Sequence, residues 1–276
     1  MKSILSISPF VVFFISLIII IHIRIEKWGE NKQYITKKNA FATLVTPAFA
    51  MGAIALGHTL RKHHNDSYDM VCLVTKDVNS TWRTILKQWW IVKIVDDFIP
   101  FGGYRRSWTK IRLWCLTEYK KIVYMDTDTL VFSSLSELFH YPELSCATDA
   151  SPPQICNTGV IVIEPSIDTY HDMIKQSKNR VNGHGIGDQG FINRYFKNYV
   201  PIPSKFNIPR IQNTGLSQHF RKNHTAVVHY VCKKPWKCGR EGVSYCGCGM
   251  PWLNNVWWEI FDQACVNRTC METWTE

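Results

Sequence analysis

The stretch Ile122-Val123-Tyr124-Met125-Asp126-Thr127-Asp128-Thr129-Leu130 decides the fold. Its first four residues are apolar with β-branched members, and the run is too short for a helix, so it predicts a buried strand. Two carboxylates follow, one residue apart. Ligands of open α/β sheets bind beyond the carboxyl ends of the strands, so we expect a polar ligand here. Two aspartates suit a hard divalent cation that also bridges phosphates. A solvated loop with two chance aspartates is the alternative.

Apolar segments and helical patterns alternate on both sides of this strand. Further strands are expected at 42–46, 70–75, 91–95, 160–163 and 227–230, and helices at 50–64, 81–90, 108–119, 135–138, 167–176 and 191–196. This alternation predicts βαβ units and an α/β fold with a mostly parallel sheet. The chain has 276 residues, of which 46% are hydrophobic and 20% charged. That composition is typical of a globular protein with one substantial core.

The N-terminal segment stands apart from the rest of the chain. Residues 4–23 carry no fixed charge and are long enough, as a helix, to span a bilayer. A cleaved signal peptide is the alternative, but it has a shorter apolar region and a small-residue cleavage site. We therefore expect a signal-anchor at 1–25, a polar stem at 26–40, a globular domain at 41–236 and a Cys/Trp-rich C-terminal extension at 237–276.

The orientation of the anchor depends on two opposing signals. More basic residues follow the anchor than precede it, where Lys2 is the only one. This asymmetry favours a cytoplasmic domain. The ten cysteines and four N-glycosylation sequons favour an oxidising lumen instead. The sequons begin at Asn65, Asn79, Asn223 and Asn267. We predict a single-pass protein of the Golgi or ER membrane with its large domain in the lumen.

The C-terminal tail is rich in cysteine and tryptophan. Its cysteines are Cys232, Cys238, Cys246, Cys248, Cys265 and Cys270. They lack the paired spacing that zinc modules favour, so disulfides are expected. The tryptophans Trp252, Trp257 and Trp258 either form a platform for sugar rings or pack the extension.

The net charge of +10 fits phosphate-bearing substrates, an anionic membrane or a polysaccharide. Nucleic acid is disfavoured as a partner because the basic residues are scattered and no nucleic-acid motif accompanies them.

Five stretches, in order between Thr43 and Trp236, resemble the family 8 glycosyltransferases. They are 49–57 (FAMGAIALG), 108–114 (WTKIRLW), 126–128 (DTD), 157–159 (NTG) and 187–190 (GDQG). One such match is weak, but five in register are specific. The resemblance implies a GT-A-like, Rossmann-type α/β fold, with a mostly parallel sheet flanked by helices, for the domain at 41–236.

The resemblance implies a metal site at the Asp-Thr-Asp motif. In the relatives this motif binds Mn²⁺ together with a histidine of a Val-Val-His segment, so the ligands here would be Asp126, Asp128 and His229. Two carboxylates and one imidazole suit Mn²⁺, which would bridge the donor diphosphate and act as a Lewis acid. A structural core histidine is the alternative for His229, but the Lys-Pro-Trp that follows it favours the ligand.

The resemblance also implies residues that bind the nucleotide-sugar donor. Those that would line the nucleotide base are Thr43, Leu44, Thr46 and Phe49. Lys110 would approach the aspartates and the diphosphate, where a cation stabilises charge on the leaving group. Lys234 would hold the diphosphate from the other side, and Asn157 would contact the sugar. The alternatives are core packing for Phe49, a solvated helix position for Lys110, and a simple turn at 157–159.

The implied catalytic residues are Asp188, Gln189 and Lys110. By resemblance, Asp188 lies at the sugar ring and Gln189 beside the anomeric carbon. The family retains anomeric configuration, and both same-face attack by the acceptor and double displacement stay open. One position departs from the family pattern, because Cys232 stands where relatives carry a glycine in the loop before the Lys-Pro-Trp.

The acceptor is expected to be a separate molecule. Self-glucosylating members carry their target tyrosine before the final Val-Val-His, but this chain has no tyrosine between Tyr199 and Tyr230. We therefore predict a retaining, Mn²⁺-dependent transfer of a hexose or uronic acid from a UDP-sugar to a glycan or glycolipid. The protein would contact the membrane through its N-terminal helix and bind no nucleic acid. The alternative is a non-catalytic lumenal binding protein of the same fold.

Overall fold

The computed structural model describes residues 38–100, 106–149, 154–178, 187–210, 225–240, 251–265 and 270. All of them belong to one compact unit, Lys38–Glu276. The predicted signal-anchor at 1–25 lies outside these residues. Within the described ranges, no helix has both the length and the apolar character needed to cross a membrane.

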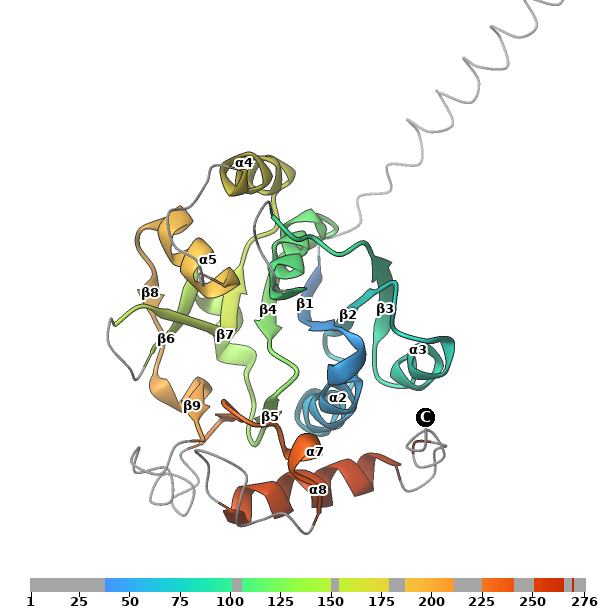
Figure 1. Cartoon of the computed structure of the whole chain (residues 1–276). Coiled ribbons are helices and arrows are strands. Elements are labelled where there is room, and N and C mark those ends of the chain that lie inside the picture. The colour runs from blue at the N-terminus through green and yellow to red at the C-terminus, as the bar shows by residue number, and fades with distance from the viewer. Residues whose placement is uncertain are drawn as a thin grey trace, which may run out of the picture. The chain divides into compact units, whose positions relative to one another are not determined.

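Seven strands form the central sheet, in the order β3-β2-β1-β4-β7-β6-β8 (Figure 1). They are β1 (Lys38–Val45), β2 (Asp69–Thr75), β3 (Ile91–Val95), β4 (Tyr119–Met125), β6 (Ser145–Thr148), β7 (Cys156–Ile163) and β8 (Val200–Pro201). Strands β3, β2, β1 and β4 are parallel, whereas β7 is antiparallel to β4 and β6, and β8 is parallel to β6. The prediction of a mostly parallel α/β sheet is therefore confirmed.

Helices cover both faces of this sheet because its central strands are apolar on both sides. The helices are η1 (Pro47–Phe49), α2 (Ala50–His64), α3 (Ser80–Leu86), η2 (Arg106–Cys115), η3 (Ser136–His140), α4 (Ile167–Ser177), α5 (Asp188–Phe196) and η4 (Ser204–Phe206). Along β1, Phe41 and Val45 pack in one core cluster with α2. Ala40 and Ala42 pack in the other cluster with η2 and α5.

A second, three-stranded sheet attaches at the carboxyl end of β4. Its strands are β5 (Thr129–Val131), β9 (Ile208–Pro209) and β10 (Val227–His229), in the order β5-β10-β9. Strand β10 runs antiparallel to β5 and pairs His229 with Thr129. Because β5 directly follows the Asp-Thr-Asp turn, this pairing brings two segments that are distant in sequence to one place.

The C-terminal extension packs on the core. Helix α7 (Pro235–Cys238) is followed by α8 (Pro251–Cys265), which lies along α2 below the central sheet (Figure 1). Trp257 and Trp258 are buried, so the packing interpretation is correct for both and the sugar platform is wrong for them. Trp252 is 37% exposed. The predicted boundary between residues 236 and 237 stays a prediction.

Among the described residues, disulfide-bonded cysteines occur in two regions. Cys232 and Cys238 are disulfide-bonded, as predicted for tail cysteines. A further disulfide, Cys146–Cys156, joins β6 to β7.

The helix expected at 108–119 is present as the 3₁₀ helix η2, with the bounds Arg106–Cys115. The alternative of a simple turn at 157–159 is wrong, because these residues lie inside β7.

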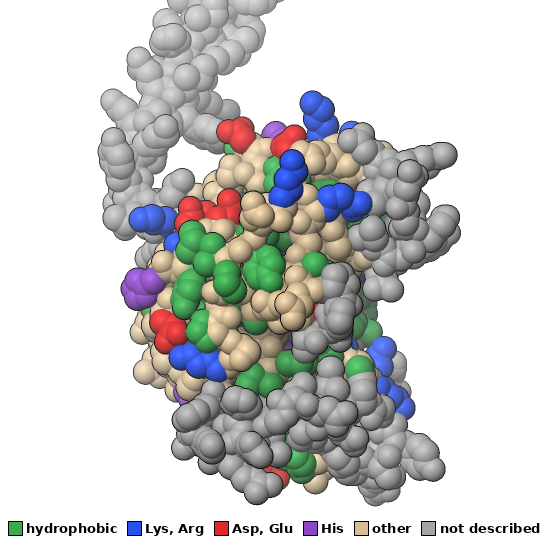
Figure 2. Space-filling model, turned by 90° about the vertical axis from the view of Figure 1, so that its left-hand side faces the viewer, with side chains coloured by type: hydrophobic (Ala, Val, Ile, Leu, Met, Phe, Trp, Pro, Cys, Tyr) green, Lys and Arg blue, Asp and Glu red, His purple; other side chains and the backbone are tan. Residues whose placement is uncertain are grey.

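Basic side chains are dispersed on the face at the β8 edge of the sheet. Figure 2 shows them scattered among acidic ones around a group of hydrophobic side chains. The described side chains on this face therefore form no continuous basic stripe of the kind that tracks a nucleic-acid backbone.

Candidate active site

The Asp-Thr-Asp turn is held by hydrogen bonds from two neighbouring strands. On the β7 side, Asp126 N donates to the carbonyl oxygen of Gly159 at 2.8 Å. On the β10 side, Tyr230 N donates to the carbonyl oxygen of Asp128 at 2.7 Å. Within the turn, Thr129 donates to the carbonyl oxygen of Asp126 through its backbone N at 3.1 Å and its hydroxyl at 2.7 Å. The turn is thus fixed on both sides, which presets the two carboxylates.

The three predicted metal ligands lie together. One ligand atom from each of Asp126, Asp128 and His229 falls within 4.8 Å of the others, and Nε2 of His229 lies 3.3 Å from Oδ1 of Asp128. Burial by itself raises the pKa of Asp128, but His229 and Lys234 outweigh it and hold that pKa below its usual range. An ionised, buried carboxylate with a second carboxylate and an imidazole beside it is a donor set that fits a divalent cation such as Mn²⁺.

Lys234 contacts the same site from the Lys-Pro-Trp loop. Its ammonium group pairs with Oδ2 of Asp128 and donates to the carbonyl oxygen of Tyr230 at 3.2 Å. Lys234 thus lies beside the predicted metal ligands, and its contact with a diphosphate stays a prediction.

Lys110 lies between two carboxylates in the interior. Its Nζ is 2.6 Å from Oδ2 of Asp188 and 3.2 Å from Oδ1 of Asp126, and the residue is only 2% exposed. The alternative of a solvated lysine is therefore wrong. Burial lowers the pKa of Lys110, but the two aspartates outweigh it and raise the pKa above its usual value. Lys110 in turn lowers the pKa of Asp188 against the effect of burial, so both groups of this pair are charged at neutral pH.

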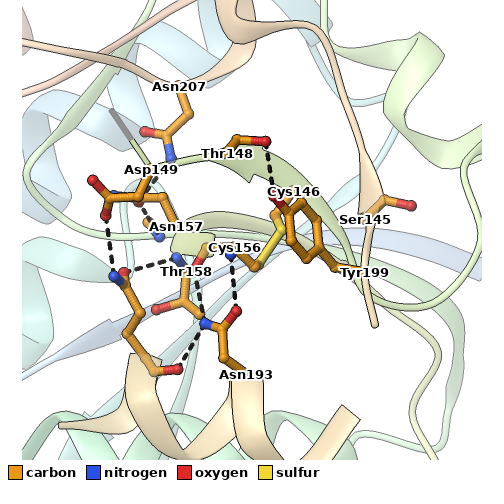
Figure 3. Close-up of a disulfide and its surroundings, with 12 residues drawn as sticks. Ser145, Cys146, Thr148, Asp149, Cys156, Asn157, Thr158, Asn193, Tyr199 and Asn207 are labelled. Atoms are coloured by element: carbon orange, nitrogen blue, oxygen red, sulfur yellow. Dashed lines mark hydrogen bonds between the residues drawn. A yellow bond between two sulfur atoms is a disulfide. The ribbon is translucent and has the colours of Figure 1, made fainter. Parts of the chain in front are cut away.

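A polar network lies on the sugar side of the predicted site (Figure 3). Gln189 donates to Oδ2 of Asp149 at 3.1 Å and accepts from Thr158 N at 3.1 Å. Asn157 donates to the same Asp149 oxygen at 3.0 Å and accepts from Asn207 at 2.8 Å. Asp149 and Asn207 were not predicted. Asp149 follows β6 just as Asp126 follows β4, so the strand-end rule would have found it had β6 been recognised.

Of the four residues predicted to line the nucleotide base, Thr43 and Leu44 are buried. The hydroxyl of Thr43 donates to the carbonyl oxygen of Met125 at 2.8 Å, and Thr46 precedes η1. Phe49 is in edge-to-face contact with Trp236 of the Lys-Pro-Trp, at 5.9 Å between ring centroids. Phe49 thus lies beside the Lys-Pro-Trp loop, and the base contacts stay predictions.

Cys232, the position that departs from the family pattern, lies in the loop before the Lys-Pro-Trp. This residue has φ of +67°, in the left-handed region that favours glycine. Because Cys232 is disulfide-bonded, a cross-link accompanies this left-handed conformation.

Solved structures of glycosyltransferases share the fold of this chain. The chain is similar in fold to the galactosyltransferase LgtC in complex with donor and acceptor sugar analogs. The TM-score is 0.59 at 16% identity, covering 82% of this chain and 95% of that one. A bifunctional glycosyltransferase, WbbM, gives a TM-score of 0.62 at 14% identity, covering 84% and 50%. The fold is therefore GT-A-like.

Comparison of sequences then gives the family. The model for Glycosyl transferase family 8 matches residues 142–238. Glycogenin-1 of Mus musculus is 32% identical over 255 residues, which are 80% of this chain and 75% of that protein. UDP-glucuronate:xylan alpha-glucuronosyltransferase 2 of Arabidopsis thaliana is 30% identical over 222 residues, covering 74% and 37%. The chain belongs to glycosyltransferase family 8, which confirms the resemblance seen in the sequence.

Proposed function

We propose that this protein transfers a hexose or a uronic acid from a UDP-sugar to a glycan or glycolipid, with retention of anomeric configuration. Mn²⁺ would be held by Asp126, Asp128 and His229. The observation that carries this proposal is the clustering of these three side chains beside the buried pair of Lys110 and Asp188. The relatives support the donor class, because the name of the plant relative specifies UDP-glucuronate.

The reaction breaks the bond between the sugar C1 and the β-phosphate oxygen and forms a bond from C1 to an acceptor hydroxyl oxygen. The proton of that hydroxyl passes to the departing UDP or to water. Bound Mn²⁺ would supply Lewis-acid stabilisation of the departing UDP. Lys110 pairs with Asp126 and Lys234 pairs with Asp128. In this proposal both lysines place positive charge where the leaving group becomes negative.

Asp188 and Gln189 serve the sugar in this proposal. Because Lys110 keeps Asp188 ionised, its carboxylate can stabilise positive character developing on the sugar ring. The Gln189 amide is oriented by Thr158 N and Asp149, so it faces the same polar network as Asn157. Same-face attack and double displacement use these groups differently, and both stay open.

Release of UDP tests the proposal directly. The full-length protein is incubated with UDP-glucose, UDP-galactose, UDP-glucuronate and UDP-N-acetylglucosamine, with Mn²⁺ or with chelator and with glycan acceptors. We expect metal-dependent release from one donor. It should be lost in Asp128→Asn and kept in Asp172→Asn, the matched control, since Asp172 is an exposed residue of α4. UDP binding without release from any donor would favour the binding protein instead.

A lumenal location is part of this proposal and has its own test. Of the four sequons, those at Asn65 and Asn79 lie in described residues, and both asparagines are exposed. Full-length protein made in a secretory host should therefore migrate faster after endoglycosidase treatment. Asn65→Gln and Asn79→Gln should each remove part of this shift. Unchanged mobility would count against a lumenal domain.

A further inference from the structure

The predicted metal ligand His229 has a different partner on each ring nitrogen. Nε2 faces Asp128 at 3.3 Å, on the metal side. Nδ1 lies 3.0 Å from Oδ1 of Asn207, a buried residue between η4 and β9. Only an imidazole nitrogen without a proton can bind a cation, so the partner of Nδ1 decides whether Nε2 is available.

The donor and acceptor in each hydrogen bond among Asp149, Asn157 and Asn207 can be assigned in sequence, starting from the carboxylate of Asp149 (Figure 3). A carboxylate accepts only, so Asn157 turns its Nδ2 toward Asp149 at 3.0 Å. Its Oδ1 then accepts from Gly159 N at 3.0 Å and from Nδ2 of Asn207 at 2.8 Å. Since Nδ2 of Asn207 is used in this way, its Oδ1 must face His229. Nδ1 of His229 therefore carries the hydrogen, and Nε2 is the nitrogen left for a cation.

The position of the imidazole ring is restricted by a separate contact. A Cβ atom built on Gly159 would lie 2.3 Å from Cε1 and 2.5 Å from Nδ1 of His229. The ring thus lies directly against the backbone of β7. It has no room to move toward that strand, which keeps Nδ1 within reach of Asn207.

We propose that Asn207 is a positioning residue that keeps the proton on Nδ1 of His229 and so presents Nε2 to Mn²⁺. Through Asn157 and Asp149, the same relay of hydrogen bonds ties the metal side of the site to its sugar side. This inference rests on the proposed metal site. Removal of a hydrogen-bond partner of a metal-binding histidine typically weakens metal binding by roughly 10- to 100-fold.

Mn²⁺ binding to the full-length protein tests the relay without relying on activity. Electron paramagnetic resonance measures free Mn²⁺ in titrations of the wild type, Asn207→Leu and Asn207→Asp. The leucine removes both hydrogen bonds and should weaken binding by roughly 10-fold or more. The aspartate still accepts from Nδ1 but cannot donate to Asn157. It should bind Mn²⁺ nearly as the wild type does, while the KM for the UDP-sugar rises.

A matched control separates this effect from a general loss of buried hydrogen bonds. Thr59 is buried and makes hydrogen bonds to Leu56 O at 2.9 Å and from Val131 N at 3.2 Å. Thr59→Val should leave Mn²⁺ affinity unchanged. Wild-type affinity in Asn207→Leu, or equal weakening in Asn207→Leu and Asn207→Asp, overturns the relay. Absence of Mn²⁺ binding in the wild type overturns the metal site itself, and the relay with it.

A second measurement needs no change at Asn207. Nitrogen-15 spectra of histidine-labelled protein with Cd²⁺, assigned by comparison with His229→Gln, report which ring nitrogen carries hydrogen. The relay predicts a protonated Nδ1 and a metal-bound Nε2 in His229. The opposite assignment would overturn it.

Discussion

Gly159 has no Cβ atom, and this leaves room for the imidazole ring of His229 in the proposed metal site. In Gly159→Ala the added methyl would lie 2.3 Å from Cε1 of His229 and 3.0 Å from Oδ1 of Asn157. The imidazole must then move, so we expect Mn²⁺ affinity and transferase activity to fall together, by roughly 10- to 100-fold. Titration with Mn²⁺ and release of UDP measure the two effects.

A second glycine provides the matched control for this prediction. Gly57 is a buried residue of α2. In Gly57→Ala the added methyl would lie 2.7 Å from Nε1 of Trp90 and 2.8 Å from Cβ of Trp89. Such overpacking should cost about 1–3 kcal/mol of unfolding free energy and leave Mn²⁺ affinity unchanged. Equal Mn²⁺ affinities in the two alanine variants would show that Gly159 does not act through His229.

Cys232 allows the effect of backbone conformation to be separated from that of a cross-link. Cys232→Gly and Cys232→Ala both remove the disulfide, but only alanine keeps a Cβ atom at the φ of +67°. The alanine variant should be less stable by about 1 kcal/mol and should have the higher KM for the UDP-sugar, because this loop leads to Lys234. Urea unfolding and initial rates measure the two differences. Identical behaviour would mean that the loop does not need the left-handed conformation.

Elements with a continuous apolar run could be predicted closely from the sequence. Helix α2 and strand β3 have the predicted bounds, and β4 ends at the predicted aspartates. Strand β6 (Ser145–Thr148) has no such run. Its extended conformation depends on pairing with β7, which the local sequence does not reveal. Helix η2 takes the 3₁₀ form in a segment held by distant contacts, such as the bond of 2.9 Å from Phe98 N to the hydroxyl of Thr109. Tertiary contacts override local preference there.

Some residues of the candidate site could be predicted from the sequence, and others could not. Asp126, Asp128 and His229 come from motifs that the sequence displays. Asn207 has no motif of its own, because its importance comes from contacts with His229 and with Asn157, which is 50 residues away in the chain. A local pattern does not encode such contacts.

Helix α2 contains a pH-sensitive contact at its last turn. His64 accepts a hydrogen bond from Leu135 N at 3.1 Å through Nε2, and its ring contacts Phe41 at 4.7 Å. Burial, with a smaller contribution from His63, lowers the pKa of His64 from 6.5 to about 4. The unfolded chain therefore binds this proton more tightly than the folded protein does. The associated stability is present above pH 6.5 and is lost as the pH falls toward 4.

His64→Gln tests this contribution because its amide oxygen can still accept from Leu135 N but does not titrate. Between pH 7 and pH 5 the wild type should lose up to about 2 kcal/mol more unfolding free energy than the variant. Urea unfolding at the two pH values gives the difference. Parallel loss of stability in both proteins would show that His64 is not the group responsible.

At the scale of the whole molecule, α8 connects the C-terminal extension to the loop that carries Lys234. Arg210, which is buried, contacts Asn254 on α8 and donates to the carbonyl oxygen of Lys233 at 2.7 Å. Trp257 of the same helix lies 5.2 Å from Trp236, between ring centroids. Through these contacts the extension supports the Lys-Pro-Trp loop.

Trp257→Ala should therefore affect both stability and donor binding. The side chain is fully buried and stacks on Phe261 at 5.2 Å, so its removal should cost about 3–5 kcal/mol of unfolding free energy. Trp252→Ala is the matched control on the same helix. Because Trp252 is 37% exposed and Trp257 is fully buried, loss of Trp252 should lower the unfolding free energy by less than loss of Trp257 does. Urea unfolding should show one cooperative transition that shifts in Trp257→Ala, together with a higher KM for the UDP-sugar. If α8 belonged to an independent module, the main transition would stay where it is and the KM would not change.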